Sequence, residues 1–271
     1  MTLRLVISDV DGTLVDHDKN LAPETVAAVR RLEARGIGFS LISARPPSGI
    51  AHLIDALRPN TAVGAFNGGT ILDPDGTVVE RHLLPRDVVE GSFALAEGTG
   101  AEPWLFADGA WHAPNRDNPH VPREILSSGV QPVIGRDMTA LFDRADKLSW
   151  VSDDYPLLEK LQNAMRDRLG DQATIALSQP YFLDLTHANA NKGAGIATLA
   201  RMAGVDLADV AVLGDQHNDL PMFARAGLSI AMGQAPDAVK AAATYVSTSN
   251  DAHGVAHAID TILLPMVEAQ A

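Results

Sequence analysis

The stretch Leu3-Arg4-Leu5-Val6-Ile7-Ser8-Asp9-Val10-Asp11-Gly12-Thr13 joins a short apolar run to two acids and a glycine. Its apolar part, Leu3–Ser8, predicts a buried strand that ends where the acids begin. A helix is predicted next, because Pro23 stands at the first helical position that proline favours and Gly36 can close the last turn. The residues that follow, Ile37–Ile42, predict a second strand. The N-terminal part therefore predicts a strand–helix–strand unit.

The alternation of strand and helix continues after this unit and returns near the C-terminus. The segments that carry it are a helix at 50–57, a strand at 62–66, a helix at 192–203 and strands at 210–213 and 228–232. Such a rhythm implies right-handed crossovers between parallel strands. The sequence therefore predicts an α/β fold with a doubly wound, mostly parallel sheet.

The middle of the chain differs in composition and pattern. It holds all 3 tryptophans and mixes strand patterns with one helix pattern at Pro156–Leu169. The strand patterns lie at 104–106, 147–151, 173–177 and 181–185. This mixture predicts an inserted α+β domain. We therefore expect one α/β domain from residues 1–83 and 187–271, with residues 84–186 inserted in it as a second domain.

Composition excludes several classes of protein. The 271 residues carry 21 Lys and Arg against 34 Asp and Glu, so no nucleic-acid partner is expected. The count of 0 cysteines excludes disulfides and thiolate metal sites. No apolar run approaches the roughly 20 residues that span a bilayer, and no membrane partner is expected. We expect a cytoplasmic monomer or homodimer that acts on a small molecule.

Polar residues follow the predicted strands, and ligands of open parallel sheets bind beyond the carboxyl ends of the strands. Ser43-Ala44-Arg45 follows the second strand, Asn67-Gly68-Gly69 the third, and Gly214-Asp215 the strand at 210–213. The candidate site residues are Asp9, Asp11, Gly12, Ser43, Arg45, Asn67, Lys192, Asp215, Asn218 and Asp219.

Four carboxylates, those of Asp9, Asp11, Asp215 and Asp219, are expected to converge on one edge of the sheet. They repel one another in a small site unless a cation lies among them. Oxygen ligands without cysteine favour Mg²⁺, which binds one or two carboxylates together with waters and a substrate phosphate. With this metal, Lys192 and Arg45 present, a phosphate dianion can enter the site.

The spacing of Asp9 and Asp11 separates two chemical roles. On an ideal strand, residues two apart point to the same face, so both side chains can reach one bound group. One carboxylate can attack phosphorus as the nucleophile, while the other exchanges a proton with the leaving oxygen. Gly12 lets the backbone turn sharply, so that main-chain N–H groups can contact phosphate oxygens.

The ordered motifs resemble those of the haloacid dehalogenase superfamily of phosphatases. The matching residues are Asp9-Val10-Asp11-Gly12-Thr13, Ser43, Lys192 and Gly214-Asp215-Gln216-His217-Asn218-Asp219. Other stretches resemble the Cof-type branch of sugar-phosphate phosphatases, namely Asn67-Gly68-Gly69, Pro221-Met222, Ile230-Ala231-Met232-Gly233 and Asn250–Val255. That branch carries a large α/β cap where the inserted domain is predicted here. The resemblance covers both ends of the chain, while the cap matches mainly by position.

The resemblance implies the chemistry of the carboxylates. Asp9 would be the nucleophile that forms an aspartyl-phosphate, and Asp11 would be the general acid and base. Mg²⁺ would bind the Asp9 carboxylate, the Asp11 main-chain oxygen and Asp215. Asp219 would hold a metal-bound water.

The resemblance also implies how the substrate is held. Ser43 and Lys192 would grip the phosphoryl group, and Lys192 would also neutralise Asp9. The other predicted substrate-binding residues are Gly12, Arg45, Asn67 and Asn218. Arg45 can instead fix its own loop by binding carbonyl groups. The expected function is Mg²⁺-dependent hydrolysis of a small phosphorylated metabolite, with sugar phosphates as the foremost class.

Two positions depart from the branch, and other functions stay open. Ala44 stands where glycine is usual and Gln234 where asparagine is common, although neither change removes a required chemical group. A phosphomutase would return the phosphoryl group to another hydroxyl. A phospho-accepting signalling domain also uses clustered Asp and Lys, but the long insertion counts against it. A metabolite-binding protein without catalysis is disfavoured because every expected carboxylate is present.

Overall fold

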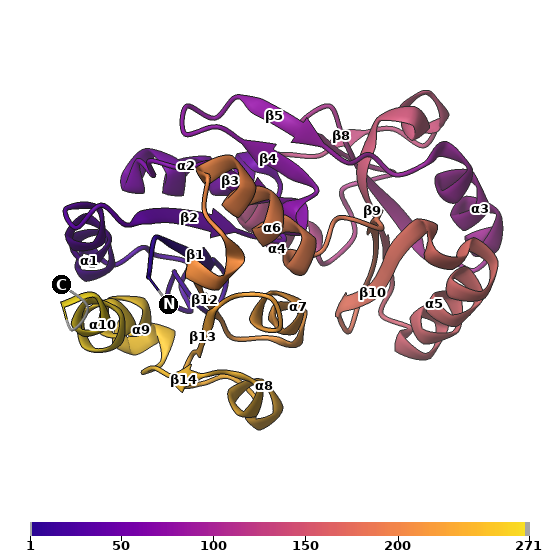
Figure 1. The fold of residues 1–271 in the computed structure, drawn as a ribbon. Coiled ribbons are helices and arrows are strands. Elements are labelled where there is room, and N and C mark those ends of the chain that lie inside the picture. Colours follow the sequence, from indigo (N-terminus) through magenta and orange to yellow (C-terminus); the bar gives the residue numbers. More distant parts are fainter. Residues whose placement is uncertain (1, 269–271) are drawn as a thin grey trace. The chain divides into compact units, whose positions relative to one another are not determined.

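The chain is organised as two compact units, and the computed structural model describes residues 2–268 (Figure 1). The predicted insertion, 84–186, lies inside the long segment of the second unit. A short segment near Ser48 also joins this unit, where Ser48 Oγ donates to the carbonyl oxygen of Ser128 at 2.6 Å. Unit 1 comprises Met1–Ala44, Ala51–Val79 and Asn191–Ala271, and unit 2 comprises Arg45–Ile50 and Glu80–Ala190.

The larger sheet of the described chain is mostly parallel. Its strands are β1 (Leu5–Asp9), β2 (Gly38–Ile42), β3 (Val63–Ala65), β4 (Thr70–Leu72), β5 (Val78–Arg81), β12 (Val210–Gly214), β13 (Leu228–Ala231) and β14 (Tyr245–Val246). They lie in the order β14-β13-β12-β1-β2-β3-β4-β5. Leu5 of β1 pairs in parallel with Gly38 on one side and Val210 on the other, whereas β3 and β4 pair antiparallel. The predicted α/β fold class is confirmed.

The helices outside the segment 80–190 follow the periodic patterns of the sequence. α1 begins with Pro23 as its first residue, and it buries one face that includes Val29 and Leu32. Ile196 of α6 packs in the same core as Ile7 of β1. The helices are α1 (Pro23–Glu33), α2 (Pro47–Leu57), α6 (Lys192–Ala203), α7 (Leu220–Phe223), α8 (Asp237–Ala242), α9 (Gly254–Ala258) and α10 (Leu264–Glu268).

Unit 2 contains a second sheet, which is almost entirely antiparallel. Its strands are β6 (Glu102–Ala107), β7 (Ala110–Ala113), β8 (Val133–Ile134), β9 (Ala145–Val151), β10 (Ala173–Gln179) and β11 (Phe182–His187). They lie in the order β10-β11-β9-β6-β7-β8, and only β7 and β8 pair in parallel. The four strands predicted in this region are confirmed, whereas β7 and β8 were not predicted.

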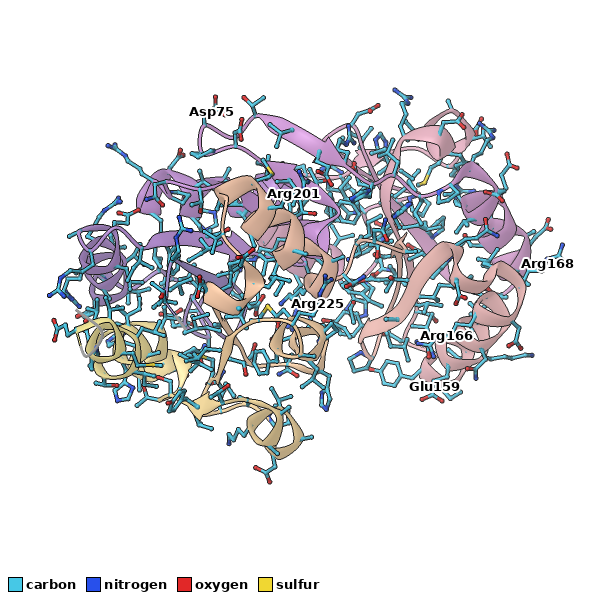
Figure 2. All side chains as sticks on the ribbon, viewed as in Figure 1. Asp75, Glu159, Arg166, Arg168, Arg201 and Arg225 are labelled. Carbon is cyan, nitrogen blue, oxygen red and sulfur yellow. The ribbon has the colours of Figure 1, made fainter. Side chains whose placement is uncertain are left out.

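Three helices complete unit 2: α3 (Arg86–Ala96), α4 (Val121–Ser128) and α5 (Tyr155–Leu169). α3 and α5 contribute Val88 and Leu158 to one core with Trp150 of β9. Arg166 of α5 also donates through Nε and Nη2 to the carbonyl oxygen of Ile175 at 3.1 and 2.8 Å (Figure 2). Within residues 2–268, no helix has the length and apolarity that crossing a bilayer requires.

Candidate active site

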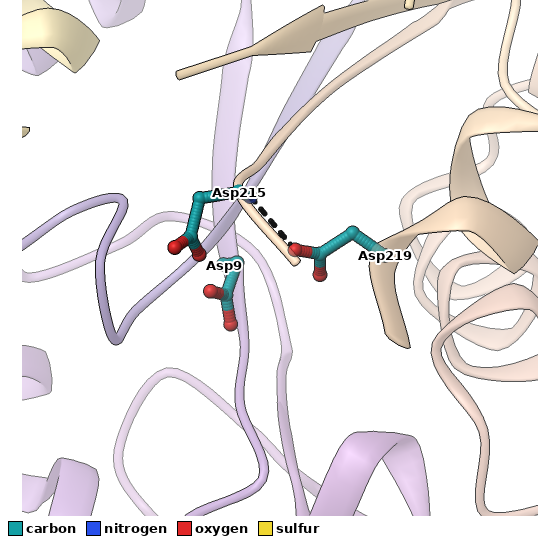
Figure 3. Close-up of side chains that lie close together, drawn as sticks. All are labelled: Asp9, Asp215 and Asp219. Atoms are coloured by element: carbon teal, nitrogen blue, oxygen red, sulfur yellow. Dashed lines mark hydrogen bonds between the residues drawn. The ribbon is translucent and has the colours of Figure 1, made fainter. Parts of the chain in front are cut away.

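Three aspartates gather where β1 and β12 end. Asp9 is the last residue of β1, Asp215 follows the last residue of β12, and Asp219 closes the short turn after it. One carboxylate oxygen from each residue lies within 4.8 Å of one oxygen from each of the other two (Figure 3). The three residues are at most 5% exposed. Because β1 and β12 are parallel neighbours, the sheet brings acids from distant parts of the sequence to one edge.

Lys192 supplies positive charge to this carboxylate cluster of Asp9, Asp215 and Asp219. Its Nζ lies 2.5 Å from Oδ1 of Asp9 and 2.5 Å from Oδ1 of Asp219, and the residue is 2% exposed. A lysine at the first position of a helix is disfavoured by the helix dipole. The two carboxylates therefore hold Lys192 at a place that the helix alone would not favour.

The start of α6 is placed by several contacts that bring Lys192 into reach. The side chain of Asn191 accepts from the N–H of Ala194 at 2.9 Å and caps the helix. Arg225, labelled in Figure 2, donates to the carbonyl oxygen of Gly193 at 2.7 Å. At Gly195, a Cβ would lie 2.5 Å from Ile42 Cδ1. It would also lie 3.0 Å from the Cα of Gly68, so glycine lets the start of α6 pack closely against the turn after β3.

Asp219 contacts both Lys192 and the backbone of the turn that carries Asp215. While Oδ1 contacts Lys192, Oδ2 accepts from the backbone N–H groups of Asp215 and Gln216 at 2.8 and 2.9 Å. Asp219 is fully buried, and both of its oxygens are used by these partners. It therefore fixes both the turn that carries Asp215 and the ammonium group of Lys192.

The cluster is short of positive charge. Burial raises the pKa of Asp9 to about 8, against the attraction of Lys192 and with the help of Asp219. Burial, then the charge of Asp219, also raise the pKa of Asp215. Burial acts to lower the pKa of Lys192, but Asp219 and Asp9 outweigh it and hold that pKa above its ordinary value. One ammonium group for three carboxylates, all oxygen donors, fits a divalent cation such as Mg²⁺.

We expect the contribution of Asp9 to the stability of the metal-free protein to fall as the pH rises from about 4 to about 8. The folded state holds a proton on Asp9 up to about pH 8, whereas the unfolded chain releases it near the ordinary pKa of 3.8. This contribution is complete below pH 3.8 and is lost as the pH approaches about 8. Asp9→Asn removes this contribution. The free energy of unfolding of the variant minus that of the wild type should therefore increase with pH, by up to about 1.4 kcal/mol per pH unit. Denaturant unfolding in EDTA at several pH values measures this difference, and a constant difference would contradict the prediction.

Gly12 lies against Asp215 on the turn after β1. Its φ of +78° is a left-handed conformation, and a Cβ there would lie 2.4 Å from Oδ2 of Asp215. Glycine thus satisfies both the backbone conformation and the close approach. Thr13 Oγ1 donates to Oδ1 of Asp215 at 3.3 Å, and Gln216 Nε2 donates to Oδ2 at 3.2 Å. These contacts orient the Asp215 carboxylate; the contact from Gln216 was not predicted.

The side chain of Asp11 is not part of the carboxylate cluster. Its Oδ1 pairs with Lys19 Nζ at 2.7 Å, and both side chains are more than a third exposed. The strand ends at Asp9, and the chain then turns, since the carbonyl oxygen of Val10 accepts from the N–H of Leu14 at 3.0 Å. The alternation expected of an ideal strand therefore stops before Asp11. This contact with Lys19 was not predicted. Lys19 lies on an exposed loop, where no pattern in the sequence indicates which side chains meet.

Ser43 and Asn67 lie after β2 and β3, as their positions predicted. The carbonyl oxygen of Ser43 accepts from the N–H of Asn67 at 2.6 Å, and Ser43 is fully buried. Phe66 and Asn67 have φ of +48° and +58°, a strained conformation that gathers at functional sites. Oδ1 of Asn67 is buried and has no hydrogen-bond partner in the described chain. An acceptor left unsatisfied in this way is available to a bound hydroxyl or water.

The two remaining candidates, Arg45 and Asn218, differ in burial. Arg45 belongs to unit 2, is 4% exposed and donates through Nη1 to the carbonyl oxygen of Gly49 at 3.1 Å. This bond fits the alternative in which Arg45 fixes its own loop. Asn218 lies on the turn beside Asp219, and its side chain is exposed. Substrate binding by Arg45 and Asn218 stays a prediction.

Comparison with known proteins decides the family. Residues 6–259 match the haloacid dehalogenase-like hydrolases. The chain belongs to this family. An HMP-PP phosphatase of Escherichia fergusonii is 28% identical over 238 residues, which are 88% of this chain and 87% of that protein. A 5-amino-6-(5-phospho-D-ribitylamino)uracil phosphatase of Bacillus subtilis is 27% identical over 258 residues, which are 95% of this chain and 94% of that protein.

A solved structure shares the fold of this haloacid dehalogenase-like hydrolase. It is that of a haloacid dehalogenase-like hydrolase from Bacteroides thetaiotaomicron, with a TM-score of 0.87 and 29% sequence identity. The match covers 96% of this chain and 99% of the other. The predicted superfamily and the prediction of a phosphatase within it are thereby confirmed.

Proposed function

We propose that this chain hydrolyses phosphate monoesters of small metabolites, sugar phosphates above all, through a phosphoenzyme formed on Asp9 with Mg²⁺ bound. The observation that carries the proposal is the buried cluster of three carboxylates around one ammonium group. Such a site transfers an anionic group once a divalent cation balances its charge. The names of the relatives, which are those of phosphatases, support the reaction class.

The residues that would hold Mg²⁺ are those implied by the resemblance to the haloacid dehalogenase motifs. Asp9 and Asp215 would bind it through their carboxylates, Asp11 through its main-chain oxygen, and Asp219 through a water. Mg²⁺ would supply the positive charge that shields the phosphoryl oxygens from these carboxylates. Ser43 and the N–H of Gly12 are proposed to contact the phosphoryl oxygens.

Two carboxylates carry the reaction. Asp9 attacks phosphorus, the bond from phosphorus to the leaving oxygen breaks, and that oxygen takes a proton from Asp11. Water then attacks the phosphorus of the aspartyl-phosphate and gives a proton to Asp11, so that inorganic phosphate leaves and the Asp9 carboxylate is restored. Lys192, bound to Oδ1 of Asp9, orients the nucleophile. Asp11 must leave Lys19 for these steps, and an exposed ion pair of about 0–1 kcal/mol permits this.

A phosphate-release screen tests the proposal. Phosphorylated metabolites, with sugar phosphates at the centre of the panel, are incubated with the protein and Mg²⁺ or with EDTA. We expect inorganic phosphate from at least one of them with Mg²⁺ and none with EDTA. Release that is indifferent to EDTA would contradict the metal role, and no release from any member would contradict the proposed reaction.

Analysis of the products and of the protein from the same incubations separates the alternative functions. An isomer of a hexose monophosphate in place of free phosphate would indicate a phosphomutase. A lasting phospho-aspartate without turnover would indicate a phospho-accepting signalling domain, and binding without either product a metabolite-binding protein. The cytoplasmic location, the monomeric or homodimeric state and the absence of nucleic-acid and membrane partners stay predictions.

A further inference from the structure

The turn that follows β1 is closed upon itself by backbone hydrogen bonds. The carbonyl oxygen of Val10 accepts from the N–H groups of Thr13, Leu14 and Val15 at 3.3, 3.0 and 3.2 Å. Asp11 and Val15 are in addition joined by a backbone bridge. Asp11, the proposed acid and base, thus lies within this turn. The backbone conformation of this turn therefore sets the position of the Asp11 side chain.

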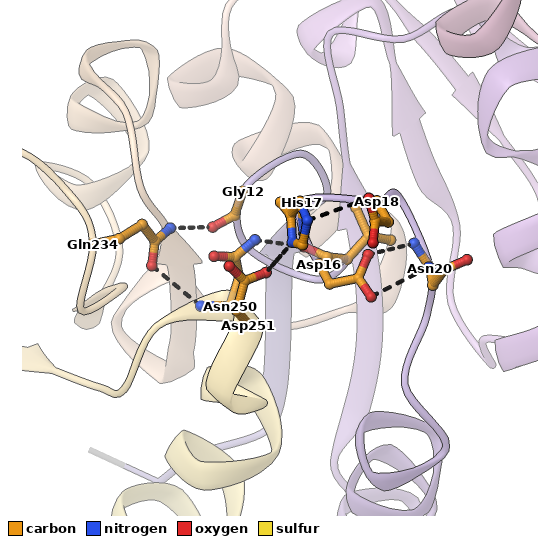
Figure 4. Close-up of polar contacts among 9 residues, drawn as sticks. Gly12, Asp16, His17, Asp18, Asn20, Gln234, Asn250 and Asp251 are labelled. Carbon is orange, nitrogen blue, oxygen red and sulfur yellow. Dashed lines mark hydrogen bonds and ion pairs between the residues drawn. The ribbon is translucent and has the colours of Figure 1, made fainter.

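Two amide side chains from a distant part of the sequence hold this turn by its carbonyl groups (Figure 4). Gln234 Nε2 donates to the carbonyl oxygen of Gly12 at 2.5 Å, and Gln234 Oε1 accepts from the N–H of Asn250 at 3.1 Å. Asn250 Nδ2 donates to the carbonyl oxygen of Val15 at 3.0 Å. Gln234 and Asn250 together form what we call the amide bridge, which runs from one end of the turn to the other.

The amide bridge is itself anchored to the sheet. Met232, at the end of β13, donates its N–H to the carbonyl oxygen of Gly214 at 3.0 Å, and Gly233 donates to that of Thr248 at 3.0 Å. Next to Asn250, the carboxylate of Asp251 accepts from the N–H of His17 at 2.9 Å. The backbone on both sides of the amide bridge is thus tied to β12 and to the turn after β1.

We propose that Gln234 and Asn250 are positioning residues for Asp11, an inference that rests on the proposed function. Neither belongs to the carboxylate cluster, and the contacts of both side chains to the turn are to backbone carbonyl groups. They act through the turn that carries Asp11. Asp9 is held differently, because it is part of β1 between β2 and β12. Loss of the amide bridge should therefore disturb proton transfer more than nucleophilic attack.

The leaving group makes this difference measurable. The alkoxide of a sugar phosphate is strongly basic and needs a proton as it departs, whereas the nitrophenolate of p-nitrophenyl phosphate departs without one. A displaced Asp11 should slow the first substrate and spare the second. A general loss of structure would slow both alike.

The test compares variants of similar shape on these two substrates. Gln234→Glu removes the donor to Gly12, and Asn250→Asp removes the donor to Val15. Each should lower kcat/KM for a sugar phosphate that the wild type hydrolyses by about 10- to 100-fold. Each should lower that for p-nitrophenyl phosphate by less than about threefold. Gln234→Ala, which adds no charge, should show the same ratio.

A matched control and a double variant complete the experiment. Gln131 is an exposed glutamine of unit 2, and Gln131→Glu should change neither substrate. Because the two amides act as one chain of bonds, the double variant should lose less than the product of the single losses. Equal losses on both substrates, or no loss on either, would overturn the inference. A wild type inactive on both would overturn the proposed function and the inference with it.

Discussion

Asp9→Asn should lower phosphate release by at least about 10⁴-fold while the protein stays folded. The amide has the size of the carboxylate but cannot attack phosphorus, so no aspartyl-phosphate forms. The fold should survive because Asp9 is the last residue of β1, whose backbone is paired on both sides. Steady-state phosphate release with Mg²⁺ measures the loss, and thermal unfolding followed by circular dichroism reports the fold.

Two further measurements make this result specific to Asp9. Acid-quenched mass spectrometry should find a phosphoryl group on Asp9 in the wild type during turnover and none in the variant. Asp55, an exposed aspartate of α2, provides the control, since Asp55→Asn should leave activity unchanged. Activity of Asp9→Asn within tenfold of the wild type would exclude Asp9 as the nucleophile.

Lys192→Met should both inactivate and destabilise the protein. The substitution keeps a long side chain but removes the ammonium group that lies 2.5 Å from both Asp9 and Asp219. Breaking a buried pair in this way leaves uncompensated charge and lowers the free energy of unfolding by about 3 kcal/mol. Phosphate release should fall on the order of 10³-fold, because the nucleophile and the phosphoryl group lose their cation. Denaturant unfolding in EDTA and phosphate release with Mg²⁺ measure the two losses.

The destabilisation can be traced to the carboxylates by a second substitution. Adding Asp219→Asn to Lys192→Met should restore part of the stability, because the amide can still accept from the backbone while carrying no charge. Added Mg²⁺ should also restore stability. Lys160→Met, at an exposed position on α5, is the control and should change little. A Lys192→Met protein as stable as the wild type would contradict the charge argument.

Much of the site could be predicted because its residues stand at the ends of regular elements. Burial of the whole of β1 gave a continuous apolar run, and Asp9 marks its end. The α6 pattern begins at Lys192 in both the prediction and the structure, since Asn191 is a favoured N-cap. Parallel strands then place such termini along one edge, which is why three of the four expected carboxylates meet.

The position of Asp11 could not be predicted from its spacing. The period of two holds only while the chain is extended, and the turn after Asp9 is closed by local bonds to Val10. Its ion pair with Lys19 depends on the shape of an exposed loop, where Lys19 itself has a φ of +69°. Loops of this kind lack the periodic burial on which prediction relies.

The boundaries of the units illustrate the same limit. The texture of the middle segment indicated an insertion at 84–186, and the structure assigns Glu80–Ala190 to unit 2. Arg45–Ile50 joins that unit as well, although it lies far away in sequence. In α3, which was not predicted, Gly91 interrupts the apolar pattern, and it permits the side chain of Leu169 to approach. Such contacts depend on pairs of distant residues and leave no local signature.

By itself, the sequence determined the α/β class, the alternation of strands and helices toward the two ends of the chain, and the identity of the acids and the lysine, because burial and capping act through neighbouring residues. Only the tertiary structure decided which oxygen of Asp219 binds Lys192, why Gly12 must lack a side chain beside Asp215, and that Gln234 reaches the turn after β1. Hydrogen bonds act over about 3 Å, and the atoms that make them come together only when the whole sheet has formed.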